Sequence, residues 1–456
     1  MSGVVGSTQK QERKVAINKT IHVVDAMMGQ GKTSAAITYI NRSPAQRRFF
    51  FLTPYVREGH RIAQACPDRQ IVVLEEKKGS KLNDLRYRVN RHENVASTHA
   101  LFERYTPDIL EKIRDGHYTL ILDEAYAVSK TITDTLKKNF LCLLNNGIVS
   151  VDPKTHLAYF TDGTARGFDS TTMKDIIDRI AAQTVYYYDN KLLIWIFPVE
   201  ILEAFDEVIV MTYLFQAQHI YYYLQINGAT FDYWGTRKLP DGQYEFCPIG
   251  EATPFAPNLN VLINILDDQK LNAIGSSPKA LCSKWAKADL AHRGGSSIEQ
   301  LGRNVRNVQK NIYQCSTKDF MWTCYKNERE LMEDKNLKYN WVQCTEKATN
   351  EWKNRHYLAY CVNLHEHPDI YDYFEMMGLT PDQDRWALSE MIQWIWRSAI
   401  RDGEEIWIYI PSKRMRTLLE NWIDEVSSTG LEGGDDVVTV SPYPNPAEDA
   451  GEKNIA

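Results

Sequence analysis

Residues 22–37 read HVVDAMMGQGKTSAAI, and this stretch decides the fold. The apolar run at its start is typical of a buried strand, and the small and apolar residues after Lys32 have helical spacing. Between them, Gly29 and Gly31 permit a tight turn whose backbone N–H groups can surround a phosphate, and the following helix adds its positive dipole end. From Ala26 the stretch matches the P-loop pattern, with alanine in place of the first glycine. It predicts a polyphosphate site on an α/β sheet.

The P-loop pattern also predicts roles for the polar residues of the loop. Lys32 is expected to reach the β and γ phosphates, and the Thr33 hydroxyl is expected to bind Mg²⁺. A glycine-rich turn without a nucleotide is the alternative, which the strand-to-helix context disfavours. The expected ATP-binding residues are Met28, Gly29, Gln30, Gly31, Lys32, Thr33 and Ser34.

A second motif, at residues 120–126, is an apolar strand that ends in two carboxylates and reads LILDEAY. Asp123 is expected to hold Mg²⁺ through its water shell, and Glu124 to orient and deprotonate the attacking water. A strand followed by an acidic helix cap has the same local pattern. Because this motif follows a P-loop, we interpret the two together as a hydrolytic NTPase site with ATP as substrate, Mg²⁺ as cofactor, and Glu124 and Lys32 among its catalytic residues.

The composition excludes several classes of protein. The chain has 456 residues, 43% hydrophobic and 25% charged, as in globular proteins large enough for two or three domains. No stretch approaches the roughly 18 uncharged apolar residues of a membrane span, and the first 14 residues lack the apolar core of a secretory signal. The eight cysteines are scattered without a C-x-x-C pair, which supports neither a zinc site nor a disulfide framework. We expect a cytoplasmic protein with no membrane partner.

The net charge of −6 is concentrated at the C-terminus. From Glu425 onward there are seven acidic residues and one basic residue, Lys453, so this segment alone carries −6. The rest of the chain is close to neutral and contains two basic stretches, Arg42 to Arg61 and Lys77 to Arg91. A solvated surface is the ordinary interpretation of such stretches. They nevertheless leave nucleic acid open as a partner.

Short apolar runs alternate with helical periodicity along most of the chain, which is typical of parallel sheets flanked by helices. We predict an α/β fold with two domains, an insertion in the first and a mixed region between them. Expected strands are 21–24, 49–53, 71–74, 118–122 and 208–211 in the first domain and 339–344, 357–362 and 406–410 in the second. Expected helices in the second domain include 388–401 and 413–424.

The same pattern divides the chain into five parts. They are a flexible leader (1–15), a first α/β domain (16–215), a connecting region (216–335), a second α/β domain (336–424) and an acidic, disordered tail (425–456). Within the first domain, residues 129–205 look inserted between two strands, and Asp189-Asn190 predicts a hairpin turn there.

The two nucleotide motifs resemble those of the superfamily 2 helicases, in which a D-E-A-x box follows the P-loop in the first of two RecA-like domains. Thr53-Pro54 follows an expected strand where that superfamily has a loop touching the nucleic-acid backbone, and Thr98-His99 stands where a second such loop is expected. Capped turns are the alternative for both. The resemblance implies nucleic-acid contacts by Thr53, Pro54, Thr98 and His99, with Arg57 in the adjoining basic stretch.

A third segment resembles the element that links hydrolysis to the second domain. Met211-Thr212-Tyr213 is similar to the superfamily's S-A-T element, at a longer distance from the D-E-A-Y box than usual, and implies Thr212 as the coupling residue. The string at 300–306 looks like the last motif of the superfamily, but it precedes the main strands of the second domain. We interpret it as a basic helix.

Residues 393–401 resemble that last motif, Q-x-x-G-R-x-x-R, with Trp396 in place of glycine and the final arginine one residue later. On one continuous helix, Gln393, Arg397 and Arg401 would share a face, so both guanidinium groups could point at ATP in the cleft between the domains. An arginine finger of this kind neutralises charge on the transferring phosphoryl group. The pattern leaves open which arginine is the finger, and an amphipathic core helix is the alternative.

As a whole, residues 18–424 look like the DEAD/DEAH-box helicase-like proteins of bacteriophages and plasmids. The shared strings are A-T-N-E (348–351), Q-W-I-W-R-S-A-I-R (393–401) and I-P-S-x-R-M-R (410–416). The resemblance implies two RecA-like domains and an ATP-dependent DNA helicase or translocase of phage or plasmid replication, working in a bacterial host cytoplasm. Single-stranded or tailed DNA and replication proteins are the implied partners.

Two other functions stay open. One is a nucleotide-gated ATPase or loader that binds nucleic acid without unwinding it. The other is a viral DNA-packaging motor, although such motors normally carry a nuclease with clustered carboxylates, and the sequence shows no convincing cluster of that kind in the second domain. The preference for DNA or RNA, the polarity and the oligomeric state are not encoded in any recognisable motif.

Overall fold

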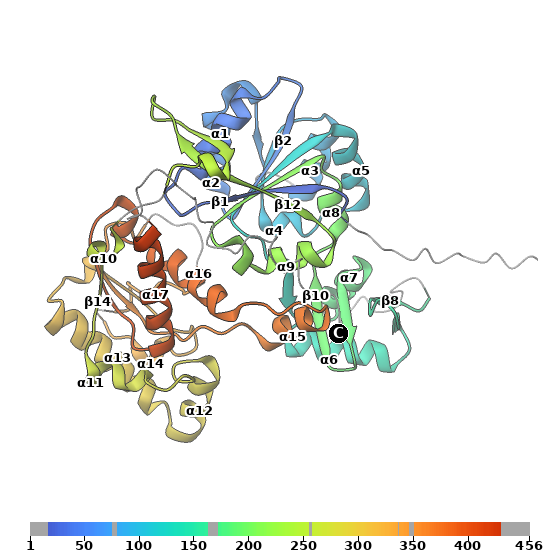
Figure 1. Cartoon of the computed structure of the whole chain (residues 1–456). Helices are drawn as coiled ribbons and strands as arrows, with labels where there is room; N and C mark the ends of the chain where they lie inside the picture. Colours follow the sequence, from blue (N-terminus) through green and yellow to red (C-terminus); the bar gives the residue numbers. More distant parts are fainter. Residues whose placement is uncertain are drawn as a thin grey trace, which may run out of the picture.

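The computed structural model contains two α/β domains and a smaller module beside them (Figure 1). It describes residues 17–74, 80–162, 172–254, 258–335, 337–345 and 351–429. The expected leader at 1–15, the string at 348–350 and most of the acidic tail lie outside these residues. None of the described helices is long and apolar enough to cross a membrane.

The first sheet has the strand order β13-β12-β1-β11-β5-β2-β4-β3, and every neighbouring pair is parallel except β12 with β13. Its central strands are continuous apolar runs because helices cover both faces. All five strands expected in this domain are confirmed. The bounds are β1 Thr20–Asp25, β2 Arg48–Thr53, β3 Val72–Val73, β4 Val95–Thr98, β5 Tyr118–Asp123, β11 Glu207–Thr212, β12 Thr230–Lys238 and β13 Tyr244–Pro248.

Two hydrophobic clusters lie on the two faces of this sheet. One contains residues of α1 and α2 packed on β2, among them Ile40, Phe51 and Ile62. The other contains residues of α3, α5 and α9 and continues into the inserted module. The helices are α1 Lys32–Arg42, α2 Val56–Ala65, α3 Lys81–Asn90, α4 His99–Phe102, α5 Pro107–Gly116 and α9 His219–Ile226.

The module is the expected insertion, built around a three-stranded antiparallel sheet in the order β6-β10-β9. The predicted hairpin is confirmed: Asp189 and Asn190 have φ values of 46° and 57°, in the left-handed region that asparagine and aspartate tolerate best. The elements are β6 Ser129–Thr131, α6 Asp134–Asn145, β7 Val149–Val151, β8 Ala158–Phe160, α7 Lys174–Ala181, β9 Val185–Tyr188, β10 Leu192–Ile196 and α8 Val199–Glu203.

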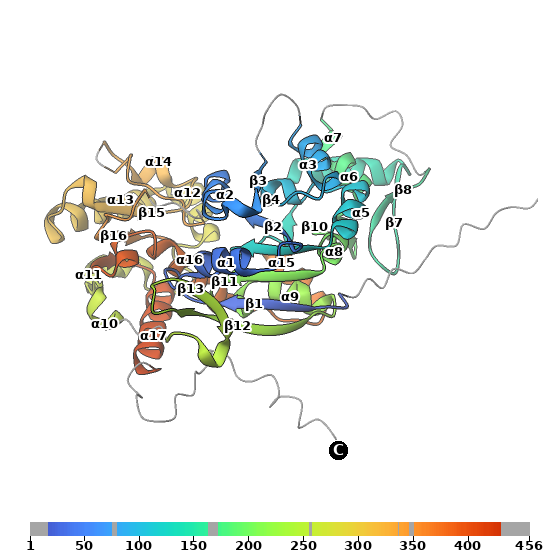
Figure 2. The same ribbon diagram turned by 90° about the horizontal axis from the view of Figure 1, so that it is seen from above.

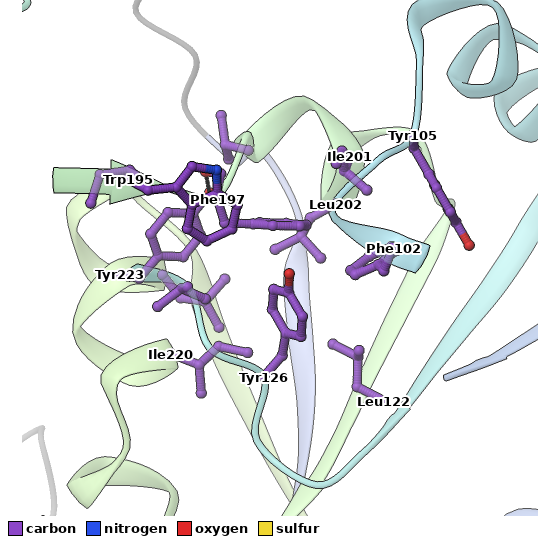
Figure 3. Packing of buried hydrophobic residues seen from close by; sticks show 14 of the residues in the cluster. Phe102, Tyr105, Leu122, Tyr126, Trp195, Phe197, Ile201, Leu202, Ile220 and Tyr223 are labelled. Carbon is purple, nitrogen blue, oxygen red and sulfur yellow. Dashed lines mark hydrogen bonds between the residues drawn. The ribbon is translucent and has the colours of Figure 1, made fainter. Parts of the chain in front are cut away.

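Figure 3 shows the cluster that joins this module to the first sheet. Tyr126, the last residue of the D-E-A-Y box, lies among aromatic rings at centroid distances of 5.6 Å from Phe102 and 5.0 Å from Phe197. Tyr126 therefore belongs to the hydrophobic core. A helix of the second domain, α15 Pro368–Met376, completes the module, with Tyr373 and Phe374 buried in the same cluster.

The second sheet is entirely parallel, in the order β14-β17-β16-β15. Its strands are β14 Ile263–Ile265, β15 Phe320–Thr323, β16 Tyr357–Tyr360 and β17 Ile406–Tyr409. Around it lie α10 Leu259–Leu262, α11 Gln269–Asn272, α12 Ser283–Arg293, α13 Ser296–Asn307, α14 Arg329–Met332, α16 Gln383–Ile395 and α17 Lys413–Thr429. The expected strands at 357–362 and 406–410 are confirmed.

Three expectations about this half of the chain differ from the structure. Residues 216–335 do not form a separate connecting region, because β12 and β13 extend the first sheet while β14 and β15 belong to the second. Residues 339–344 are not a strand, since Trp341 forms a single bridge to Trp322 and Tyr339 is 79% exposed. The last helix continues to Thr429, so the expected start of the tail at 425 is too early.

A buried carboxylate in the second domain predicts a pH-dependent stability. Glu328 is 3% exposed, and burial, with a smaller contribution from Asp289, raises its pKa to about 8. The folded protein therefore holds a proton that the unfolded chain releases near pH 4.5, so the free energy of unfolding should fall as pH rises from about 5 to about 8 and level off above that. The fall should be on the order of a few kcal/mol.

Urea unfolding across this pH range is the measurement. Glu328→Gln should make the fall clearly smaller, because the contribution of Glu328 is removed and that of the other buried carboxylates stays. Glu330→Gln, at an exposed position two residues away, should keep the whole fall. Equal pH dependence in the wild type and in Glu328→Gln would contradict the assignment.

Candidate active site

The glycine loop has the conformation that the P-loop pattern requires. Gly29 and Gly31 have φ values of 88° and 77°, which residues with a Cβ rarely adopt, and α1 begins directly after them at Lys32. The loop follows β1, at the carboxyl end of the parallel strands. In this arrangement the N-terminus of α1 and the loop amides can bind an anion together.

Lys32 is almost buried, and its amine contacts the loop it belongs to. Nζ donates hydrogen bonds to the carbonyl oxygens of Ala26 at 2.5 Å and Met27 at 3.2 Å. Burial lowers the pKa of this amine, while the carboxylates of Glu124, Asp123 and Asp25 act in the opposite direction. The structure thus brings Lys32 together with both acids of the D-E-A-Y box.

The two acids of the box stand at the end of β5, which is separated from β1 by β11 in the first sheet. Asp123 is 9% exposed, and burial, together with neighbouring Glu124, raises its pKa to about 7. Glu124 has a φ of 69°, and its N–H donates to the carbonyl oxygen of Met211 at 3.0 Å. A left-handed conformation costs a residue with a Cβ on the order of 1–2 kcal/mol and is concentrated at functional sites.

The donor set near Lys32 fits Mg²⁺. Thr33 follows Lys32 in the first turn of α1, and Asp123 interacts electrostatically with the Lys32 amine. Hydroxyl and carboxylate oxygens are the ligands that Mg²⁺ prefers, with water and phosphate completing the shell. Thr33 and Asp123 remain the residues that would hold the ion.

Thr212 contacts the P-loop, and the next residue contacts the second domain. Its carbonyl oxygen accepts from the N–H of Ala26 at 3.0 Å, and its side chain is fully buried. Tyr213 accepts a hydrogen bond at its hydroxyl from the Trp422 indole of α17 at 3.0 Å. The expected coupling segment therefore lies between the phosphate loop and the second domain.

Two further contacts, which no sequence motif indicated, support the same segment. The carboxylate of Asp25 accepts from the N–H groups of Leu214 and Phe215, both at 2.9 Å. The Gln218 amide donates to the Ser389 hydroxyl of α16 at 2.9 Å. Asp25, directly before the P-loop, thus holds the start of the segment 214–218. The Ser389 hydroxyl of the second domain contacts the end of this segment, at Gln218.

The expected single helix face for the arginines is wrong. α16 ends at Ile395, after which the N–H of Arg397 bonds to Trp394 and that of Ala399 bonds to Arg355. These bonds turn the chain out of the helix, so residues 399–402 form a separate 3₁₀ turn. Gln393, on α16, therefore does not share a helix face with either arginine.

The structure separates the environments of the two arginines. Arg397 is 5% exposed and acts electrostatically on Cys344 and Tyr360 inside the second domain. Arg401 is exposed, lines a cavity together with Met28, Gly29 and Gln30, and acts electrostatically on Lys32. Of the two candidates, Arg401 is the one brought to the phosphate loop.

The expected nucleic-acid residues lie at the ends of β2 and β4. Thr53 is 1% exposed, so its hydroxyl does not reach the surface in this arrangement. Pro54, Thr98 and His99 are partly exposed and Arg57 is exposed. Most arginines of the two basic stretches, Arg57 among them, pair with carboxylates: Arg42, Arg47, Arg57, Arg61, Arg86, Arg88 and Arg91.

The strings at 300–306 and 410–416 are structural in this fold. Gly302 of α13 lies so close to Met332 that an added Cβ would come within 2.7 Å of its carbonyl oxygen. Arg414 donates to the side chain of Asn363 at 3.0 Å and to the carbonyl oxygen of Leu364 at 2.7 Å. The interpretation of 300–306 as a helix is confirmed.

The β12–β13 hairpin is a part of the site that the sequence analysis missed. The Thr236 hydroxyl donates to the carbonyl oxygen of Gln30 at 2.7 Å, and the Tyr244 ring lies where a Cβ on Gly31 would be, at 2.3 Å. Figure 2 shows β13 beside α1, with helices of the second domain next to it. The residue pattern of 230–238 could have indicated a strand. No neighbouring residue, however, indicated that this strand contacts Gln30, 206 positions earlier in the chain.

Comparisons with known proteins extend over nearly the whole chain. Residues 257–423 match the family model described as the YonV C-terminal Rossmann-like domain. Among solved structures, an XPD helicase has a TM-score of 0.46 and 11% identity, with 88% of this chain and 94% of that chain covered. A DEAD box protein from Methanococcus jannaschii has a TM-score of 0.24 and 12% identity, with coverages of 90% and 86%.

A curated relative is closer in sequence. Over 420 residues the chain is 33% identical to the SPbeta prophage-derived protein YonV of Bacillus subtilis (strain 168). The match covers 89% of this chain and 98% of the relative. The family model begins at 257, near the start of the second domain as β14 defines it. The chain belongs to the YonV family.

Proposed function

We propose that the chain is an ATP-driven motor on nucleic acid, most specifically a DNA helicase or translocase acting in the replication of a phage or plasmid. The observation that carries the proposal is the joint position of Lys32, Glu124 and Arg401. Lys32 begins α1 directly after the loop that follows β1, Glu124 follows β5 of the same sheet, and Arg401 comes to the same loop from the second domain. Two domains that meet at a P-loop in this way can change their separation as ATP is bound and hydrolysed.

In this proposal the first domain binds the nucleotide. The loop amides and Lys32 hold the phosphates, the Lys32 amine exchanging its two carbonyl contacts for charge-assisted bonds to phosphate oxygens. Thr33 and Asp123 hold Mg²⁺, which when bound neutralises charge on the phosphates. Glu124 orients the attacking water and accepts its proton.

In this proposal the second domain completes the ATP site, and its position changes when ATP is bound and hydrolysed. Arg401 stabilises the charge that develops on the transferring phosphoryl group. The Thr212–Tyr213 segment transmits the change, because it contacts the P-loop through Ala26 and the second domain through Trp422. The loops at Pro54, Arg57 and Thr98 would contact the backbone of the strand, which requires no base-specific readout.

Steady-state ATPase activity measured with and without single-stranded DNA, single-stranded RNA and duplex DNA tests this proposal. Stimulation of at least about tenfold by single-stranded DNA, absent in Glu124→Gln, is expected, since a motor couples turnover to its track. Stimulation by RNA alone would show that the polymer on which the motor acts is RNA and not DNA. An ATPase rate that is the same with and without each of the three polymers would contradict the coupling of ATP hydrolysis to nucleic acid. The protein would then be an ATPase with another partner.

A strand-displacement assay on a tailed duplex separates a helicase from a loader. A helicase releases the shorter strand in an ATP-dependent reaction from a duplex with a 5′ or a 3′ tail. ATP hydrolysis without release from either substrate would favour the nucleotide-gated loader.

A further inference from the structure

The glycine loop opens into a cavity of about 300 Å³ that has three walls. One wall is the P-loop itself, at Met28 to Gln30. The second is the β12–β13 hairpin, and the third is the part of the second domain formed by α10 and the turn at 399–402. A cavity of this size, continuous with a phosphate-binding loop, lies at the lower end of the range for small-molecule sites.

The hairpin wall is held rigidly against the loop. Thr236 donates to the Gln30 carbonyl oxygen, and the Tyr244 ring lies directly against Gly31. At the outer side of the hairpin, Glu245 accepts from Arg42 of α1 at 3.0 Å and from Arg237 at 2.7 Å. Contacts from both strands of the hairpin therefore fix it against the glycine loop and α1.

The wall from the second domain is apolar except for Arg401. Leu259 anchors α10 in the core, whereas Leu262 at the end of the same short helix is partly exposed and faces the cavity. Ile400, one residue before Arg401, also lines the cavity. On the opposite side, exposed Lys238 of β12 is the cationic group of the hairpin wall. Apolar surface with a few polar groups at the rim is the lining that a flat heterocycle with a hydroxylated sugar requires.

We infer that this cavity holds the base and ribose of the nucleoside triphosphate whose phosphates bind the P-loop. The inference rests on the proposed function and adds the substrate-recognition residues to it. Leu262 supplies apolar contact to the nucleoside, and Lys238 supplies a hydrogen-bond donor at the rim. Because the walls come from both domains, a bound nucleoside bridges them, and nucleoside binding favours the arrangement in which Arg401 reaches the loop.

Equilibrium binding of two probes tests the inference on the full-length protein with Mg²⁺. One probe is ATP, and the other is inorganic tripolyphosphate, which carries the three phosphates without a nucleoside. Leu262→Ala and Lys238→Ala should each weaken ATP binding by about five- to tenfold, because contacts to the nucleoside are lost. Both should leave tripolyphosphate binding within about twofold of the wild type.

Val261→Ala is the matched control, since Val261 precedes Leu262 on α10 but is 53% exposed and is not among the residues that line the cavity. It should bind both probes as the wild type does. Lys238 is exposed, so its variant tests the cavity even if Leu262→Ala alters α10. ATP affinity unchanged in both cavity variants, or equal weakening of both probes, would overturn the inference while leaving the P-loop site intact. A wild type that binds neither probe would overturn the proposed ATPase as well.

Discussion

Replacing Arg401 by alanine is expected to lower ATP turnover by about 10³-fold or more, the effect usual for an arginine finger. Arg401 is an exposed residue of the 3₁₀ turn at 399–402 and lines the cavity at the P-loop. Removing its guanidinium deletes charge stabilisation in the transition state but little packing, so the melting temperature should stay close to that of the wild type. Single-turnover hydrolysis at saturating MgATP is the measurement, because it separates the chemical step from nucleotide binding.

Arg397→Ala is the matched control for this prediction. Arg397 is buried inside the second domain near Tyr360, so its truncation should lower the melting temperature by several degrees. Turnover per folded molecule should fall much less than in Arg401→Ala. The reverse result, with a stable but inactive Arg397→Ala and an active Arg401→Ala, would move the finger to Arg397.

Replacing Glu124 by glutamine should lower ATP hydrolysis by about 10²- to 10⁴-fold, the range for loss of a general base. The amide keeps the size of the side chain but cannot accept a proton from water. ATP affinity should be retained or increased, because one negative charge near the phosphates is removed. Measurement of MgATP affinity beside the hydrolysis rate distinguishes this result from loss of the whole site.

A second carboxylate serves as the control for charge alone. Glu58 of α2 also acts electrostatically on Asp123, but it pairs with Arg61 at 3.1 Å and belongs to no part of the proposed chemistry. Glu58→Gln should therefore hydrolyse ATP within about threefold of the wild type. A comparable loss in both variants would show that the charge around Asp123, and not a base at Glu124, controls the rate.

The sequence predicted the parts of this protein whose causes are local. A run of apolar residues before Gly29 can form a buried strand, and two glycines at fixed spacing can adopt the left-handed conformations of an anion-binding turn. The apolar strand ending in Asp123 and Glu124 has an equally local signature. The hairpin at Asp189-Asn190 was predictable for the same reason, since its positive φ values depend on two adjacent residues.

The arginine segment shows where local reasoning stops. Residues 388–401 have helical spacing throughout, and the pattern alone continues the helix to Arg401. In the structure α16 ends at Ile395, and the N–H of Ala399 bonds to the carbonyl oxygen of Arg355, 44 positions earlier in the chain. Along this path Arg397 is buried inside the second domain, whereas Arg401 lines the cavity at the P-loop.

The motifs of the proposed ATP site and most strands of the two sheets therefore follow from neighbouring residues, because glycine conformations, strand periodicity and carboxylate chemistry act over a few positions. The boundary between the domains, the hairpin wall at Tyr244 and the choice between the two arginines depend on pairs of residues far apart in the chain. Strand pairing and side-chain packing create those pairs only when the chain has folded, so no short stretch of the sequence contains them.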